Sequence, residues 1–201
     1  MAVSSPNATK KPLRVLLLED NASDAALISH ELQRSGARIQ VTRVDSAEAF
    51  TAALKSFAPD VVLSDHSLAQ FNSRAAMEIL REVRPTAPFI VVTGNLIASQ
   101  AGMAIRAGAE DVILKSNLRG LEASIGNALT VRRRLHALTD RQIQVLKFVA
   151  EGQRTREIAK RLGLSIKTIE SHRSEIMKRL RIHDVVSLVR YSIRVGIISA
   201  V

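Results

Sequence analysis

Five polar side chains in the N-terminal part of the chain directly follow short apolar runs. They are Glu19, Asp20, Asp65, Thr93 and Lys115. Clustered carboxylates repel one another unless a cation lies among them, and oxygen ligands with open positions suit Mg²⁺. A carboxylate is also a nucleophile towards phosphorus, while a metal, a lysine and a hydroxyl can neutralise the charge of a transferring phosphoryl group. Taken singly, each residue is more simply explained as a turn residue, a helix cap or a solvated surface group.

Short strands alternating with helices must position these groups. Apolar runs predict strands at Leu13–Leu18, Ile39–Val44, Val61–Ser64, Phe89–Val92 and Val112–Leu114. Amphipathic stretches predict helices at 23–35, 46–56, 74–83, 99–107 and 117–135. The strands are continuous apolar runs, which is typical of a sheet buried on both faces. We therefore predict an α/β fold with a doubly wound, five-stranded parallel sheet, which binds ligands beyond the carboxyl ends of its strands.

The net charge of +10 is unevenly distributed along the chain. Residues 1–130 contain 13 basic and 13 acidic residues, whereas residues 131–201 contain 16 basic and 6 acidic residues. A basic surface confined to one short domain suits a polyanion such as nucleic acid, although a solvated basic face is an equal alternative on charge alone. Aromatic residues are scarce and tryptophan is absent, which disfavours single-stranded binding by base stacking.

The C-terminal part has an all-helical pattern. Predicted helices cover Leu138–Ala150, Thr155–Leu162, Ile166–Arg181 and Asp184–Val195. The second ends at Gly163 and the third is capped by Ser165, so a tight turn joins them. This pattern predicts a second, smaller all-α domain with a helix-turn-helix.

The Ile166–Arg181 helix has two contrasting faces. We expect its apolar face, Ile166, Ile169, Ile176 and Leu180, to pack inward. The opposite face carries Lys167, Ser171, Ser174 and Lys178. A small, cationic face of this kind can enter a major groove, and the alternative is a solvated face on a core helix.

Four blocks in the first part of the chain resemble those of response-regulator receiver domains. They are LLLEDN (16–21), PDVVLSD (59–65), PFIVVTG (88–94) and AGAEDVILK (107–115). The resemblance implies a flavodoxin-like receiver in which Asp65 accepts a phosphoryl group from a sensor histidine kinase. It implies that Mg²⁺ is held by Glu19, Asp20, Asp65 and the backbone carbonyl of Ser67. It also implies that Thr93 and Lys115 bind the phosphoryl group.

Three positions depart from the receiver pattern. Val112 stands where the family usually has an aromatic residue that moves with the hydroxyl, while Ala69 and Ser116 stand where proline is common. The metal and phosphate chemistry is intact in the sequence. Phosphorylation of Asp65 is therefore better supported than any particular route by which it is transmitted.

The run LTDRQIQVLKFVAEGQRTREIAKRLGLSIKTIESHRSEIMKRLRI (138–182) resembles the LuxR-type DNA-binding domain, and the two domains together resemble the NarL/FixJ class. This implies a homodimer on double-stranded DNA, with RNA polymerase as a further candidate partner. The predicted DNA-contacting residues are Lys167, Thr168, Glu170, Ser171, His172, Ser174 and Lys178. Glu170 stands where many relatives carry lysine. The resemblance also implies dimerisation through Val185, Leu188 and Val189, unless the last helix only closes the core.

We divide the chain into a tail (1–11), a receiver domain (12–130), a helical linker (131–137) and a DNA-binding domain (138–201). The absence of cysteine excludes disulfides and thiolate metal sites. We find no signal peptide and no apolar run of about 20 residues, so we predict a cytoplasmic protein without a membrane partner.

We predict a two-component response regulator rather than an enzyme, in which phosphoryl transfer to Asp65 controls sequence-specific DNA binding and transcription. One alternative is a DNA-binding regulator whose atypical receiver responds to a partner or ligand. A phosphatase is a second alternative, disfavoured because Ser67 stands where a second acid is commonly found. The third, an RNA-binding antiterminator, is disfavoured by the LuxR-type pattern.

Overall fold

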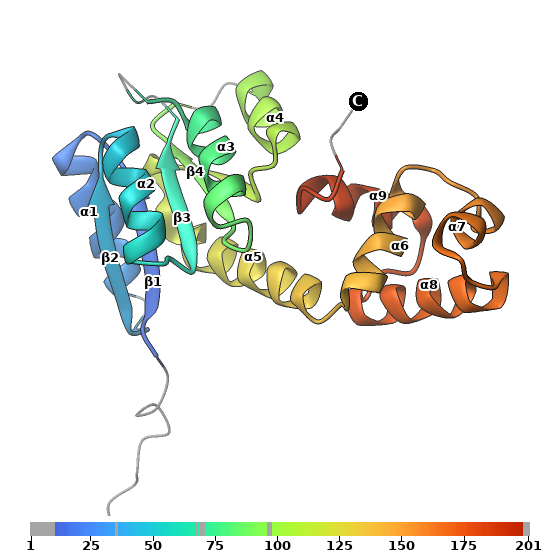
Figure 1. Cartoon of the computed structure of the whole chain (residues 1–201). Coiled ribbons are helices and arrows are strands. Elements are labelled where there is room, and N and C mark those ends of the chain that lie inside the picture. Colours follow the sequence, from blue (N-terminus) through green and yellow to red (C-terminus); the bar gives the residue numbers. More distant parts are fainter. Residues whose placement is uncertain (1–10, 35, 67, 69–70, 96–97, 199–201) are drawn as a thin grey trace, which may run out of the picture.

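The protein is described by a computed structural model, which covers residues 11–34, 36–66, 68, 71–95 and 98–198. An α/β domain is followed along the chain by a smaller, all-helical domain (Figure 1). Within the described residues, no helix is both long and apolar enough to cross a membrane.

The first domain is built on a parallel sheet. Its strands are β1 (Leu13–Leu18), β2 (Ile39–Val44), β3 (Val61–Asp65), β4 (Phe89–Thr93) and β5 (Asp111–Leu114). They lie in the order β2-β1-β3-β4-β5, and all neighbours are parallel. The predicted fold is confirmed. β3 and β4 are each one residue longer than predicted, so Asp65 and Thr93 are the last residues of their strands.

Helices cover both faces of the sheet. One face carries α1 (Ala22–Arg34) and α5 (Leu121–His136), and the other carries α2 (Ala47–Ser56), α3 (Ser73–Val83) and α4 (Ala98–Ala107). Leu17 packs with Ile28 and Ile125 on the first face, while Leu16 packs with Phe50 on the second. Adjacent strand residues point to opposite faces, so two cores explain why the strands read as continuous apolar runs.

The chain after β5 differs from the prediction. A 3₁₀ helix, η1 (Lys115–Gly120), precedes α5, where a single helix from residue 117 was expected. Asn117, inside η1, has φ −141° and ψ 69°, which are not helical values, so a regular helix cannot begin at this residue. Lys115 consequently stays at the end of the sheet, while Leu118 is buried among the residues under α1.

The second domain contains α6 (Asp140–Ala150), α7 (Thr155–Leu162), α8 (Ile166–Leu180) and α9 (Val185–Arg194). Gly163 ends α7 in the left-handed conformation (φ 65°), and the Ser165 hydroxyl accepts from the Thr168 N–H to begin α8. A glycine at this position tolerates a backbone that most residues disfavour. Gly163 and Ser165 therefore determine the tight turn between α7 and α8.

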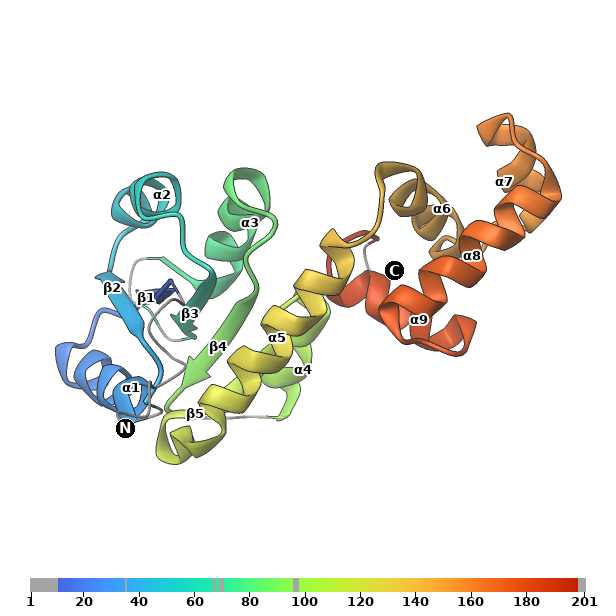
Figure 2. The ribbon, with the colours of Figure 1, turned by 90° about the horizontal axis from the view of Figure 1, so that it is seen from below.

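Helix α5 connects the two domains (Figure 2). Its first half packs under the sheet, whereas Val131 and Leu135 near its end pack against the core of the second domain. The Tyr191 hydroxyl of α9 donates to the Val131 carbonyl at 3.1 Å. Burial is the main cause that raises the pKa of Tyr191 to about 12, so the hydroxyl stays protonated and able to donate at neutral pH.

Candidate functional site

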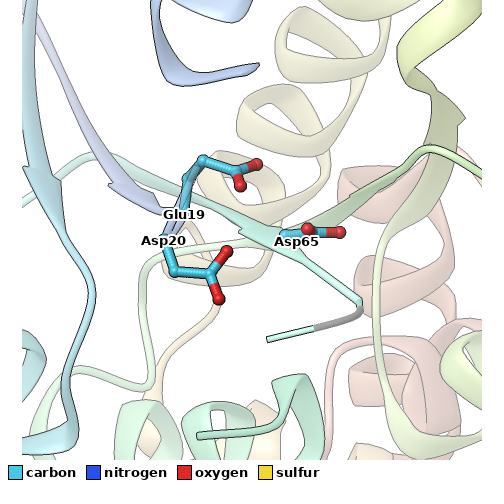
Figure 3. Close-up of side chains that lie close together, drawn as sticks. All are labelled: Glu19, Asp20 and Asp65. Carbon is cyan, nitrogen blue, oxygen red and sulfur yellow. The ribbon is translucent and has the colours of Figure 1, made fainter. Parts of the chain in front are cut away.

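The carboxyl ends of the strands bring acidic side chains from distant parts of the chain together. Glu19 and Asp20 follow β1, and Asp65 ends the adjacent strand β3 (Figure 3). Each can offer one carboxylate oxygen so that the three atoms lie within 4.8 Å of one another. Glu19 and Asp65 are buried and Asp20 is exposed, so the cluster opens to solvent on one side.

The Lys115 ammonium lies among these carboxylates. Its Nζ is 2.7 Å from Glu19 Oε2, 2.6 Å from Asp24 Oδ2 and 2.9 Å from Asp65 Oδ2. Burial acts to lower the pKa of Lys115, but hydrogen bonds to Asp24, Glu19 and Asp65 outweigh it and raise the pKa above its ordinary value. Lys115 therefore carries a full positive charge at neutral pH.

Glu19 is held rigidly at the centre of the cluster. Its side chain is fully buried, and its Oε1 accepts from the Asn21 N–H at 3.1 Å. The pKa of Glu19 is raised, mainly by burial and further by the nearby charge of Asp65. Hydrogen bonds from Lys115 and Asn21 act in the opposite direction but do not cancel this rise. The Arg43 guanidinium donates to the Glu19 and Asp20 carbonyls, which fixes the backbone that carries both acids.

The donor set fits a magnesium ion. Three carboxylates from two strand ends supply oxygen ligands only, and the exposed side leaves room for water. A divalent cation bound among Glu19, Asp20 and Asp65 would lower the repulsion between these clustered carboxylates. The predicted ligand Ser67 lies outside the described residues, as does Ala69.

Thr93 reaches the same edge of the sheet. It ends β4, beside β5 and Lys115, and is buried. Its hydroxyl donates to the Asn95 carbonyl at 2.9 Å in this structure. Val112 lies on β5 and packs against the core under α2, α3 and α4, so a small aliphatic side chain fills the position of the expected aromatic residue.

Sequence reasoning missed Asp24, which forms the shortest of the Lys115 contacts. Asp24 lies in the first turn of α1, four residues after Asp20. A sequence signal exists, because Asn21 can cap a helix and an acid in the first turn then sits close to the strand end. Lys115 directly follows β5, 91 residues after Asp24, and its contact with Asp24 could only be seen in the structure.

Most of the predicted DNA-contacting residues are exposed on α8. Lys167, Glu170, Ser171, Ser174 and Lys178 are exposed on α8, whereas Thr168 and His172 are partly buried. The Thr168 hydroxyl lies 2.8 Å from the Ser165 hydroxyl at the helix cap. The exposed residues form one continuous face.

One residue of α8 corrects a sequence prediction, and the burial of residues on α9 bears on another. Ile166 is 43% exposed rather than packed inward, because it is the first residue of α8 and lies beyond the core formed by Ile169 and Ile176. Leu188 is 2% exposed in the core of its own domain, which agrees with the alternative that the last helix closes this core, and its part in dimerisation stays a prediction. Val185 is exposed and Val189 is partly buried.

An ion cluster around one buried carboxylate joins the two domains. Glu110, just before β5, has a fully buried side chain that accepts from Arg132 Nε at 2.9 Å and from Arg194 Nε at 2.5 Å. Arg132 belongs to α5 and Arg194 to α9. Arg132 also donates to the Val195 carbonyl at 3.0 Å. The set of Glu110, Arg132 and Arg194, called the Glu110 clasp below, therefore fixes α9 against the first domain.

Two family models match the chain. Residues 15–125 match the response regulator receiver domain, and residues 136–192 match the bacterial regulatory proteins of the luxR family. The chain belongs to these families: it is a two-component response regulator with a receiver domain and a LuxR-type DNA-binding domain. Receiver domains bind Mg²⁺ at an acidic site, and the cluster of Glu19, Asp20 and Asp65 is acidic.

Known proteins resemble the chain over most of its length. The transcriptional regulatory protein FixJ of Rhizobium meliloti is 31% identical over 170 residues, which are 75% of this chain and 81% of that protein. The Fimbriae Z protein of Salmonella typhimurium is 25% identical over 203 residues, 90% of this chain and 97% of that protein. Solved RcsB from Salmonella typhimurium has a TM-score of 0.52 at 21% identity, covering 90% of this chain and 97% of its own. This structural likeness shows the fold.

We predict that Lys115→Ala destabilises the receiver domain by about 3 kcal/mol, because it leaves buried carboxylates without their cation. Added Mg²⁺ should restore part of this loss, since it replaces the missing charge. Thermal unfolding with and without Mg²⁺ measures both effects. Lys55→Ala, which removes an exposed lysine of α2, is the control. An equal effect of Mg²⁺ on the melting temperatures of the two variants would contradict the prediction.

Proposed function

We propose that Asp65 accepts a phosphoryl group from the phosphohistidine of a sensor kinase, and that this event controls sequence-specific DNA binding and transcription. One observation carries the proposal: the Asp65 carboxylate lies 2.9 Å from the Lys115 ammonium and within 4.8 Å of two further carboxylates. The nucleophile, a cation for the phosphoryl oxygens and a set of oxygen ligands for Mg²⁺ occur together at one strand edge.

The chemistry follows from this placement. An Asp65 oxygen attacks phosphorus, the phosphorus–nitrogen bond of the donor breaks, and the histidine leaves with the bonding electron pair. A magnesium ion, held by Glu19, Asp20 and Asp65, would neutralise charge on the phosphoryl oxygens. Lys115 binds one of these oxygens. Thr93 becomes a further donor once its hydroxyl leaves the Asn95 carbonyl.

We expect wild-type protein treated with acetyl phosphate and Mg²⁺ to gain the mass of one phosphoryl group, and Asp65→Asn to gain none. Asparagine cannot form the acyl phosphate, yet it fills the same space. Intact mass spectrometry reads the result, and Asp60→Asn, on the loop before β3, is the matched control that should label normally. A wild-type protein that stays unlabelled under conditions that label a known receiver would overturn the proposal and favour a receiver controlled by a partner or ligand.

The exposed face of α8 is the proposed DNA surface. It carries Lys167, Glu170, Ser171, Ser174 and Lys178, and it belongs to the domain that holds the chain's excess positive charge. Helix N-terminal residues of a helix-turn-helix contact base edges, whereas cations further along contact phosphates. Glu170 can accept from cytosine N4 and repels phosphate, so it favours some sites over others.

Lys178→Ala should weaken DNA binding about equally for specific and unrelated sequences. The binding constant K falls as the salt concentration rises, so the plot of log K against log salt concentration has a negative slope. If Lys178 contacts one phosphate, its loss makes this slope less steep by about 1. A salt series of binding titrations measures the slope, with Lys55→Ala on the receiver domain as the control. An unchanged slope for Lys178→Ala would place the phosphate contacts elsewhere on the domain.

The Glu110 clasp suggests how the two domains are coupled. β4 ends at Thr93 and β5 ends directly before Lys115. The other ends of both strands lie at the clasp, where the Glu110 N–H donates to the Phe89 carbonyl at 2.8 Å. We propose that the clasp holds the DNA-binding domain on the receiver and hinders two copies from docking on neighbouring half-sites. Phosphorylation at one end of these strands loosens the clasp at the other. The homodimer then uses exposed residues of α9 such as Val185.

Arg194→Gln should raise the DNA affinity of the unphosphorylated protein by about fivefold or more, the usual lower range of coupling between sites. This variant breaks the link to α9 but leaves Glu110 paired with Arg132, so no buried carboxylate is stranded. Arg190→Gln removes an equal charge from an exposed position of α9 and is the control. Equal affinities of the two variants would show that the clasp does not restrain DNA binding.

A further inference from the structure

Asp24 contacts the receiver site without belonging to its predicted metal ligands. Its Oδ2 lies 2.6 Å from Lys115 Nζ, and its side chain is 35% exposed. The acidic group that could share one metal ion consists of Glu19, Asp20 and Asp65. Asp24 therefore influences the site through its ion pair with Lys115 rather than as one of the clustered metal ligands.

The local backbone fixes Asp24 in this position. The Asn21 side-chain oxygen accepts from the N–H groups of Ser23 and Asp24 at 2.8 and 3.3 Å, which begins α1. The Asn21 N–H in turn donates to Glu19 at 3.1 Å. The strand end, the helix cap and the first helical turn are thus tied together, and the N-terminus of a helix is a favourable place for a carboxylate.

Three carboxylates surround the Lys115 ammonium. Its Nζ donates to Asp24 Oδ2 and Asp65 Oδ2, and Glu19 Oε2 forms an ion pair with it at 2.7 Å. A phosphoryl group on Asp65 also needs a donor from Lys115. Glu19 is fully buried and tied to Asn21, whereas Asp24 is partly exposed, so Asp24 is the carboxylate that can yield.

We infer that Asp24 is a positioning residue that holds the Lys115 ammonium in competition with the phosphoryl group, an inference that rests on the proposed phosphorylation of Asp65. Its negative charge has two opposite consequences. It attracts a divalent cation to the site, and it repels a phosphoryl group while drawing Lys115 away from it. Asp24 thus favours the magnesium-loaded, unphosphorylated receiver and limits how fully the protein is phosphorylated.

Asp24→Asn in the full-length protein separates the two consequences. The variant should bind Mg²⁺ about two- to fivefold more weakly, and at saturating Mg²⁺ it should bind beryllofluoride, a stand-in for the phosphoryl group, about two- to fivefold more tightly. These ranges correspond to a partly exposed charge pair. Titration calorimetry measures the Mg²⁺ affinity, and fluorine NMR measures bound beryllofluoride. A merely structural role would weaken both ligands together.

Two further variants complete the test. Glu31→Gln removes another carboxylate of α1, one paired with Arg34, and should change neither affinity. Asp24→Glu restores the charge and should return both affinities towards wild type. If wild type binds beryllofluoride and Asp24→Asn binds it equally or more weakly, the inference is overturned. If wild type binds no beryllofluoride and takes no phosphoryl group from acetyl phosphate, the proposed function itself fails, and the inference fails with it.

Discussion

The receiver site depends on one ammonium group placed among carboxylates that would otherwise repel one another. Lys115 contacts acids that follow β1, begin α1 and end β3, so a single side chain ties together segments far apart in the sequence. Buried charges of this kind are tolerated only when they are paired. A divalent cation and a transferable phosphoryl group are the two ligands whose binding would change the charge balance of this cluster.

The parallel sheet connects the receiver site to the contact with the DNA-binding domain. Because β4 and β5 run in the same direction, their carboxyl ends carry Thr93 and Lys115, while Glu110 lies at the opposite end of β5 beside α5 and α9. A shift at the site can therefore move along rigid strands to the contact with the DNA-binding domain. This route does not require an aromatic residue at position 112, where the chain has Val112.

The sequence predicted what depends on local pattern and chain order. Apolar runs located all five strands, and the rule that ligands bind beyond parallel strand ends placed Asp65 and Lys115 at one edge. Asp24 and Glu110 escaped prediction because their roles depend on Lys115 and Arg194, which meet them only after folding. Helical periodicity shows that a face is apolar but not which neighbour covers it, so the sequence could not decide whether Leu188 packs in its own core or against a second copy.

The central claim is that phosphorylation of Asp65 controls DNA binding. It is tested most directly by DNA-binding titrations of wild type and Asp65→Asn, each with and without acetyl phosphate and Mg²⁺, at one fixed salt concentration. The account predicts that acetyl phosphate tightens binding by wild type and leaves Asp65→Asn unchanged. Identical responses of the two proteins, or a labelled wild type whose DNA affinity does not change, would contradict it.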